Sequence, residues 1–277
     1  GSKRKDEIGE LSRAFDEMAE RIEVLLAAER RLLQDVSHEL RSPLARLGFA
    51  VELAREDDER EQALARVRKE ADRMTALVGE LLQLTWIEGD PTAGALQEVS
   101  LDQLLGDIAS DCQVESAARG CRLMLKVDQP IVVAGQPELL HRAIENTVRN
   151  AIRHTEEGTA VELTIERKGD LATVSVRDHG PGVPDAFLAD IFKPFFRVED
   201  DRSRSSGGVG LGLAIARRAV EIHHGRITAR NAHPGLAITI ELPAVGQDSD
   251  LVIEKSRHEQ CWNLFPRGQE PSPFRLR

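Results

Sequence analysis

Apolar side chains repeat at helical spacing in three stretches of the first third of the chain, and this pattern constrains the fold most. The first stretch, from Ile8 to Leu25, has successive spacings of 3, 4, 3, 4 and 3, which is a heptad seam typical of a coiled coil. The second and third stretches span 33–54 and 64–81, on either side of the charged segment 55–61. Two helices with a short polar connection form an antiparallel hairpin. Because one hairpin cannot bury two apolar stripes, we expect a homodimer that forms a four-helix bundle.

A linker rich in helix-breaking residues at 89–94 separates this region from a mixed pattern of helices and strands. Helical periodicity occurs near 101–118, 137–154, 185–192 and 210–224. Strand-like runs are Arg122–Val127, Val161–Arg167, Leu171–Arg177, Arg226–Ala229 and Ala237–Leu242. Since helices and strands do not alternate strictly, the pattern predicts a two-layer α+β domain with helices on one face of the sheet.

Composition excludes several classes of function. The formal net charge of -10 opposes a nucleic-acid partner, which requires clustered positive charge. Cys112, Cys121 and Cys261 lack the spacing of a zinc site and fit free thiols in a reducing compartment. The sequence contains no run of 18 apolar residues, so we expect no membrane span within it. The leading Gly1-Ser2 resembles a cloning scar.

The first candidate site is the segment Ser37–Leu44. His38 lies about 160° around the helix from the centre of the apolar stripe and is expected to face solvent. Glu39 can accept the Nδ1 proton and leave Nε2 as a nucleophile, while Ser42, one turn later, shares the face of His38. Pro43 removes a helical hydrogen bond and is expected to bend the helix. An exposed histidine is more often plain surface, and the motif alone leaves that alternative open.

The second candidate site is a polar helix face. Asn146, Asn150, Arg153 and His154 follow one another at i, i+4, i+7 and i+8. Amide oxygens at this spacing can hold Mg²⁺, and Arg153 is suited to a phosphate. A solvated helix face is the alternative.

Two glycine-containing motifs follow. Asp178 comes directly after a strand and begins Asp-His-Gly-Pro-Gly, where the carboxylate can accept a hydrogen bond from an exocyclic amine. Gly180 and Gly182 let a flat ring approach the backbone. The segment 206–213 places glycines at a helix start, where backbone N–H groups can bind phosphate. It is neither a Walker loop nor a dinucleotide fingerprint.

The order of these motifs resembles the bacterial sensor histidine kinase family. The matching segments are Ser37–Leu44 as H box, Asn146–His154 as N box, Asp178–Gly182 as G1 box, Phe192–Arg197 as F box and Gly208–Gly212 as G2 box. Asp6-Glu7-Ile8-Gly9 resembles the start of the second helix of a HAMP domain. The segment VSHELRSPLARL is similar to the corresponding segment of Cpx-type envelope-stress sensors.

The resemblance implies a domain order and a function. The expected parts are a HAMP helix at 1–28, a dimerisation and phosphotransfer hairpin at 29–88, a linker at 89–98, a Bergerat-type ATP-binding domain at 99–245 and a disordered tail at 246–277. The implied activity is ATP-dependent autophosphorylation of His38, transfer to an aspartate of a response regulator, and phosphatase activity on that regulator. The implied setting is the cytoplasmic portion of an inner-membrane protein.

Residue roles also follow from the resemblance. Asn150 would ligate Mg²⁺ with help from Asn146, and Asp178 would read adenine. Gly208, Gly210, Leu211 and Gly212 would lie at the phosphates, with residues 199–208 as an ATP lid. Three positions depart from the usual pattern: Val209 replaces a common Thr, His154 replaces a common Tyr, and Ser42 replaces a Thr or Asn that positions water.

Two other functions remain as alternatives. A hydrolytic Bergerat ATPase would carry a catalytic Glu one turn before the metal-binding Asn, but that position is Asn146, and Glu145 points about 100° away. A kinase-inactive dimeric scaffold would bind nucleotide and regulator without phosphorylation. Incubation with γ-labelled ATP discriminates this scaffold from a kinase.

Overall fold

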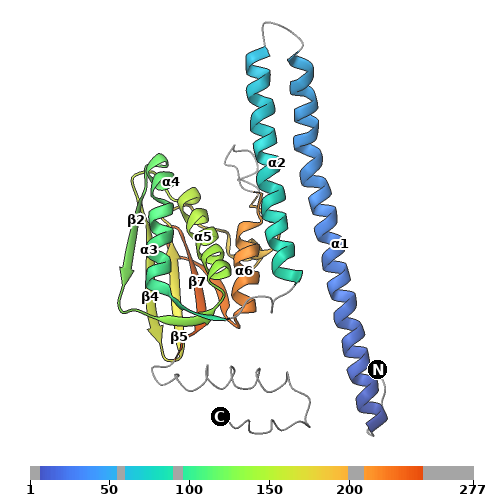
Figure 1. Cartoon of the computed structure of the whole chain (residues 1–277), viewed down its shortest axis with the longest axis vertical. Coiled ribbons are helices and arrows are strands. Elements are labelled where there is room, and N and C mark those ends of the chain that lie inside the picture. Colours follow the sequence, from blue (N-terminus) through green and yellow to red (C-terminus); the bar gives the residue numbers. More distant parts are fainter. Residues whose placement is uncertain (1–6, 55–59, 90–95, 199–208, 246–277) are drawn as a thin grey trace, which may run out of the picture.

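The structure, a computed structural model, describes residues 7–54, 60–89, 96–198 and 209–245 (Figure 1). Its first part is a hairpin of two long helices, α1 (Glu7–Leu53) and α2 (Arg60–Gly89). Helix α1 is continuous through the predicted boundary at 28/29, contains Pro43 in its interior, and extends well beyond α2 toward its N-terminus. None of the described helices combines the length and the apolar character that crossing a membrane requires.

The hairpin buries only part of its apolar stripes. Val36 and Ala50 of α1 and Ala63 and Leu77 of α2 are buried. Many other large apolar side chains of the two helices are more than 40% exposed in a single chain, including Ile8, Leu11, Phe15, Met18, Ile22, Leu33, Leu44, Val51, Leu64 and Val78. The two helices therefore bury one row of apolar side chains against each other and leave a second apolar surface exposed.

The second part is a two-layer α+β domain, as the sequence predicts. Its sheet has the order β2-β4-β5-β7-β6, in which β2 and β4 are parallel and the other neighbours are antiparallel. The strands are β2 (Arg122–Val127), β4 (Ala160–Lys168), β5 (Leu171–Arg177), β6 (Arg226–Asn231) and β7 (Leu236–Pro243). The helices are α3 (Leu101–Asp111), α4 (Gln113–Ala118), α5 (Pro137–His154) and α6 (Gly212–Ile222).

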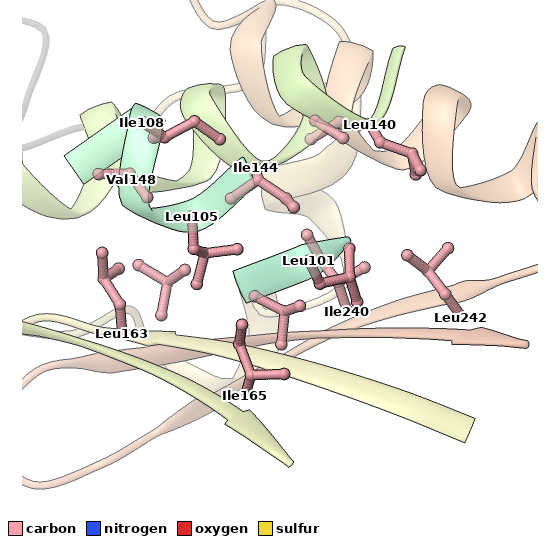
Figure 2. Close-up of a cluster of buried hydrophobic side chains, with 14 of the residues drawn as sticks. Leu101, Leu105, Ile108, Leu140, Ile144, Val148, Leu163, Ile165, Ile240 and Leu242 are labelled. Atoms are coloured by element: carbon pink, nitrogen blue, oxygen red, sulfur yellow. The ribbon is translucent and has the colours of Figure 1, made fainter. Parts of the chain in front are cut away.

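The main core lies between the sheet and the helices packed on it. Figure 2 shows Leu105 and Ile144 above Leu163 and Ile165 of β4, all fully buried. The inward residues of β4 alternate with Glu162, Thr164 and Glu166, which gives this strand one apolar and one polar face. The helices α3, α5 and α6 therefore share one side of the sheet and fix the position of the polar face of α5.

Three local features differ from the sequence-based prediction. The range 185–192 forms two short 3-10 turns, Asp185–Phe187 and Asp190–Phe192, in place of one helix. Cys112 divides the predicted helix 101–118 into α3 and α4. A second small sheet joins β1 (Gln97–Ser100) to β3 (Val132–Gly135), two strands that the sequence analysis did not recognise. Strands of four residues carry too little alternation to be detected.

A second hydrophobic cluster joins the hairpin to the α+β domain. Leu77 of α2 is buried together with Val209, Leu211 and Ile215. Helix α6 accordingly lies beside α2 (Figure 1). The apolar Val209, which departs from the family pattern, is thus one of the buried residues of this contact.

Candidate functional site

A cavity of about 1570 Å³ lies beside α5, between the loop that follows β5 and the start of α6. Nine of the residues singled out from the sequence line it: Asn146, Asn150, Arg153, His154, Asp178, Gly180, Gly182, Gly210 and Gly212. They come from the three segments predicted as N box, G1 box and G2 box. The fold therefore brings together residues as far apart in the sequence as Asn146 and Gly212, which are separated by 66 positions (212 − 146).

Asp178 is buried at the end of β5, with 3% of its surface exposed. Its Oδ1 accepts hydrogen bonds from the backbone N–H of Gly180 (2.8 Å) and Leu236 (3.1 Å). Burial raises the pKa of Asp178 above its ordinary value, while these two donors and the nearby His154 and His179 act in the opposite direction. Because both backbone donors bind Oδ1, Oδ2 is the oxygen that remains for a ligand amine.

Glycine is required at two positions beside Asp178 because there is no room for a side chain. A Cβ on Gly180 would lie 2.1 Å from the carbonyl oxygen of His154. A Cβ on Gly235 would lie 1.8 Å from the carbonyl oxygen of Asp178, and the φ of Gly235 is +91°. These close backbone approaches hold the loop after β5 against α5 and against the turn that precedes β7.

The polar face of α5 supplies the amides. Asn146 and Asn150 line the cavity, and an ideal Cβ on Gly212 would lie 3.3 Å from Asn146 Oδ1, so α5 and the start of α6 are in close contact. The described residues contain no group of three or more His, Cys, Asp or Glu side chains that would bind a metal by itself. An amide oxygen beside a phosphate site fits Mg²⁺, which usually takes one or two protein ligands together with phosphate oxygens and water.

The glycine-rich loop is described from Val209 onward, so Gly208 and the lid residues 199–207 lie outside the described residues. Gly210 has a φ of +86°, and its carbonyl accepts a hydrogen bond from the backbone N–H of Phe195 (2.9 Å). The predicted F box thus supports the predicted G2 box. The side chain of Leu211 is fully buried in the cluster with Leu77 and does not line the cavity, so only its backbone could take the predicted phosphate role, which stays a prediction.

One wall of the cavity consists of residues that the sequence motifs do not reveal. Asn231, at the end of β6, accepts from the N–H of Val183 (3.0 Å) and donates to the carbonyl of Val183 and to Asp185 Oδ1 (both 2.7 Å). Asn231 and Gly235 line the cavity together with the apolar side chains of Val183, Ile191, Phe196 and Leu236. The turn 231–235 is visible in the sequence as a break between strands, but nothing there shows that it faces Asp178.

A carboxylate from the hairpin also reaches the cavity. Glu80 of α2 lines it opposite Arg153, and within the described part of the chain no hydrogen bond reaches the buried Oε2 of Glu80. Burial raises the pKa of Glu80 and lowers the pKa of Arg153, and the charge of each acts against the shift of the other. Glu80 was not predicted from the sequence, because it reaches the cavity only through the packing of α2, where it lies one turn after the buried Leu77, against the α+β domain.

The H box lies apart from this cavity. His38, Glu39 and Ser42 are exposed on α1, as predicted for His38, and none of them lines the large cavity. Glu39 and Ser42 instead border a separate cavity of about 30 Å³ together with Arg46 and Arg73. The structure therefore brings together the predicted nucleotide residues but not the predicted phosphoacceptor.

Comparisons with known proteins agree with this division into two parts. The family described as "His Kinase A (phospho-acceptor) domain" matches residues 28–90, and "Histidine kinase-, DNA gyrase B-, and HSP90-like ATPase" matches residues 135–246. Sensor protein PfeS of Pseudomonas aeruginosa is 40% identical over 247 residues, which are 87% of this chain and 53% of that protein. Sensor histidine kinase CpxA of Escherichia coli is 33% identical over 232 residues, 83% of this chain and 50% of that protein. The chain thus spans about half the length of the curated relatives it matches.

Solved structures show the same fold. The structure of full-length ShkA in complex with AMPPNP matches with a TM-score of 0.58 and 27% identity, over 76% of this chain and 44% of that one. ThkA in complex with the response regulator protein TrrA matches with a TM-score of 0.66 at 22% identity, over 87% of this chain and 68% of that one, which shows a shared fold only. With both family matches falling on the parts that carry His38 and the cavity, the chain belongs to the sensor histidine kinases and is similar to PfeS and CpxA among them.

Proposed function

We propose that the chain is an ATP-dependent protein-histidine kinase that phosphorylates itself on His38 and passes the phosphoryl group to an aspartate of a response regulator. The observation that carries this proposal is the pairing of an exposed helical histidine with a separate cavity. That cavity combines a buried carboxylate, two amides and a glycine loop at a helix start.

The cavity suits ATP in two ways. First, Asp178 Oδ2 can accept a hydrogen bond from the exocyclic amine of adenine, and Ile191 and Phe196 give the same cavity apolar side chains for its ring. Second, the backbone N–H groups at the start of α6 and the positive charge of Arg153 can bind phosphates.

Mg²⁺ would be held by the Asn150 side-chain oxygen, with Asn146 beside it, and when bound it would neutralise phosphate charge. In the transfer step, Nε2 of His38 forms a bond to the γ-phosphorus as the bond from that phosphorus to the β,γ-bridging oxygen breaks. The electron pair leaves with ADP. Glu39 accepts the Nδ1 proton of the imidazole. The chain's contribution is mainly position and charge, as is usual for phosphoryl transfer.

The hairpin carries the proposed partner surfaces. Its exposed apolar stripe is suited to a second copy of the chain, which completes a four-helix bundle. The exposed face with His38 and Ser42 would meet the receiver domain of the response regulator. Since ATP and the regulator are cytoplasmic, we place the chain on the cytoplasmic side of an inner-membrane protein, with 1–28 as the HAMP-derived helix.

We assign a reverse activity to the same face. Ser42 would position a water molecule that attacks the regulator's phosphoaspartate. The water oxygen bonds to phosphorus, the aspartyl oxygen leaves with the bonding electrons as carboxylate, and both water protons end on the released phosphate. A Ser hydroxyl can orient water but lacks the methyl group that restricts the rotamers of Thr.

The hydrolytic ATPase fits less well. Its catalytic Glu would have to be Glu145, whose Oε1 accepts a hydrogen bond from Arg149 Nε (3.1 Å). Glu145 is therefore engaged in an ion pair within α5. An arginine-paired carboxylate is a poor general base, and the histidine-bearing hairpin would have no role.

Incubation with γ-labelled ATP tests the kinase directly. The parent protein should acquire acid-labile, base-stable phosphate, and Asn150→Ala should acquire it slower by about two orders of magnitude or more. Absence of label on the parent would favour the scaffold. Near-normal labelling of Asn150→Ala at saturating Mg-ATP would refute the role given to Asn150.

A further inference from the structure

The hairpin contains an ion pair that reaches the proposed phosphatase residue. Arg46 lies on α1 one turn after Ser42, and its Nε and Nη2 donate to the two carboxylate oxygens of Glu70 on α2, each at 2.9 Å. The Glu70 side chain is only 14% exposed, whereas that of Arg46 is 45% exposed. A two-point pairing of this kind fixes the plane of the guanidinium group as well as its position.

The third donor of the same guanidinium is directed at Ser42. Arg46 Nη1 donates to Ser42 Oγ at 2.5 Å. Because Glu70 fixes the plane of the group, Nη1 holds the serine oxygen in one rotamer. The hydroxyl proton and the second lone pair of Oγ remain available to a water molecule. Arg46 thereby supplies the restraint that a threonine methyl group would provide at this position.

Charge and space support the same arrangement. The hydrogen bond to Glu70 raises the pKa of Arg46, and the hydrogen bond from Arg46 lowers the pKa of Glu70, so the pair is ionised at neutral pH. The cavity of about 30 Å³ beside them is lined by Glu39, Ser42 and Arg46. That volume suffices for one water molecule, and the lining offers several polar partners.

We propose that Arg46, fixed by Glu70, is a positioning residue for the phosphatase reaction: it holds the Ser42 hydroxyl in the orientation that binds the attacking water. The proposal rests on the phosphatase role given to Ser42. Arg46 acts through Ser42 and does not touch the phosphoryl group, so its effect depends on the serine hydroxyl.

A double-mutant cycle tests this dependence, with dephosphorylation of purified phospho-regulator in the presence of ADP as the readout. Arg46→Met should slow dephosphorylation about tenfold or more in the parent background, because a misoriented group loses most of its catalytic effect. It should cause no further loss in the Ser42→Ala background. The control is Arg68→Met, the same change at an exposed arginine of α2, which should retain the parent rate.

A charge exchange separates positioning from hairpin stability. Arg46→Glu combined with Glu70→Arg restores the ion pair between α1 and α2 but places no guanidinium beside Ser42 on its own helix. Its melting temperature should return to the parent value while dephosphorylation stays slow. Recovery of the dephosphorylation rate by the exchange would show that the pair acts only as a structural link, and would overturn the proposal.

The remaining outcomes distinguish this proposal from the function on which it rests. If Ser42→Ala dephosphorylates the regulator as fast as the parent, or the parent does not dephosphorylate it, the phosphatase role of Ser42 fails and this proposal fails with it. If Ser42→Ala is slow but Arg46→Met is not, only the role of Arg46 is refuted. An additional loss from Arg46→Met in the Ser42→Ala background would mean that Arg46 acts on the regulator directly.

Discussion

The hairpin and the α+β domain bury their apolar residues in different ways. The domain has its own core of 25 buried residues, from Val99 to Leu242. The hairpin, with two helices of 47 and 30 residues, buries few large side chains and leaves Leu33, Leu44 and Leu64 more than half exposed. A domain with a complete core can fold alone, whereas a half-covered hairpin needs another surface.

This difference matches the separate roles of the two regions in the proposed reaction, in which the domain binds the nucleotide and the hairpin carries the phosphoacceptor. A rigid core fixes Asp178, Asn150 and the glycine loop at the positions that a nucleotide requires. The hairpin presents His38 and Ser42 on a solvent-facing surface, where a second protein can reach them. Binding of the small ligand thus depends on internal packing, and phosphotransfer depends on an assembled surface.

The largest expected effect concerns the ligand face of the domain. Asp178→Asn keeps an Oδ1 acceptor for the N–H groups of Gly180 and Leu236, so the domain should remain folded. The second position would then present an NH₂ donor to the amine of adenine. We expect ATP affinity to fall about 100-fold, measured by calorimetry. Unchanged affinity in a folded variant would show that Asp178 does not contact adenine.

The next prediction tests whether the cavity wall depends on core packing. Gly235→Ala places a Cβ against the backbone of Asp178 at a φ of +91°, whereas Gly158→Ala, at +84°, meets nothing within 4 Å among the residues that the structure describes. Urea denaturation should show Gly235→Ala less stable than Gly158→Ala by about 2.5 kcal/mol, since both carry the φ strain and only one carries the clash. Equal losses for the two variants would contradict the close approach seen here.

A third prediction concerns the uncovered surface of the hairpin. Leu64 is 54% exposed in the single chain and should be buried by the second copy. Leu64→Asp should weaken dimerisation by about 30-fold, which corresponds to about 2 kcal/mol of lost apolar burial. Sedimentation equilibrium of the parent, this variant and a control variant measures the effect. The control is Gln62→Asp, which lies about 200° around the helix and should dimerise normally. Similar association of all three proteins would place the dimer interface elsewhere.

The smallest expected effect is a pH dependence within the domain core. His223 is buried, its Nε2 accepts from the backbone N–H of Gln136 (2.9 Å), and its Nδ1 lies 2.7 Å from the carbonyl oxygen of Ala219. Burial lowers its pKa. The unfolded chain therefore binds a proton more readily, and the stability contribution is complete above about pH 6.5 and declines as the pH falls below that value.

His223→Gln retains an acceptor but cannot be protonated. Between about pH 7.5 and about pH 5.5, the melting temperature of the parent should decrease more than that of the variant, by an amount corresponding to roughly 1 kcal/mol or less. Parallel pH profiles would show that another group controls acid sensitivity.

The sequence predicted the elements with strong periodicity and the residues carried by motifs. The exposed position of His38, the long strands and the residues of α5 that line the cavity all follow from local spacing. Asn231, Gly235 and Glu80 could not be predicted, because they reach the cavity only through tertiary packing of a turn and of the hairpin. Leu211 was assigned to the phosphate loop by its place in the motif, but its side chain turns into the cluster with Leu77.

Some predictions concern segments outside the described residues. These are Gly208, the lid before it and the tail 246–277, for which the sequence predicts disorder. The role of Pro43 in bending α1 likewise stays a prediction.

The most direct test of the division between hairpin and domain is to phosphorylate His38→Gln with γ-labelled ATP while measuring its ATP affinity. We expect the acid-labile label to disappear and the ATP affinity to stay at the parent value, because His38 does not line the nucleotide cavity. His224→Gln, a change at an exposed histidine of the α+β domain, should be labelled like the parent. Label persisting on His38→Gln would contradict the assignment of the hairpin as phosphoacceptor.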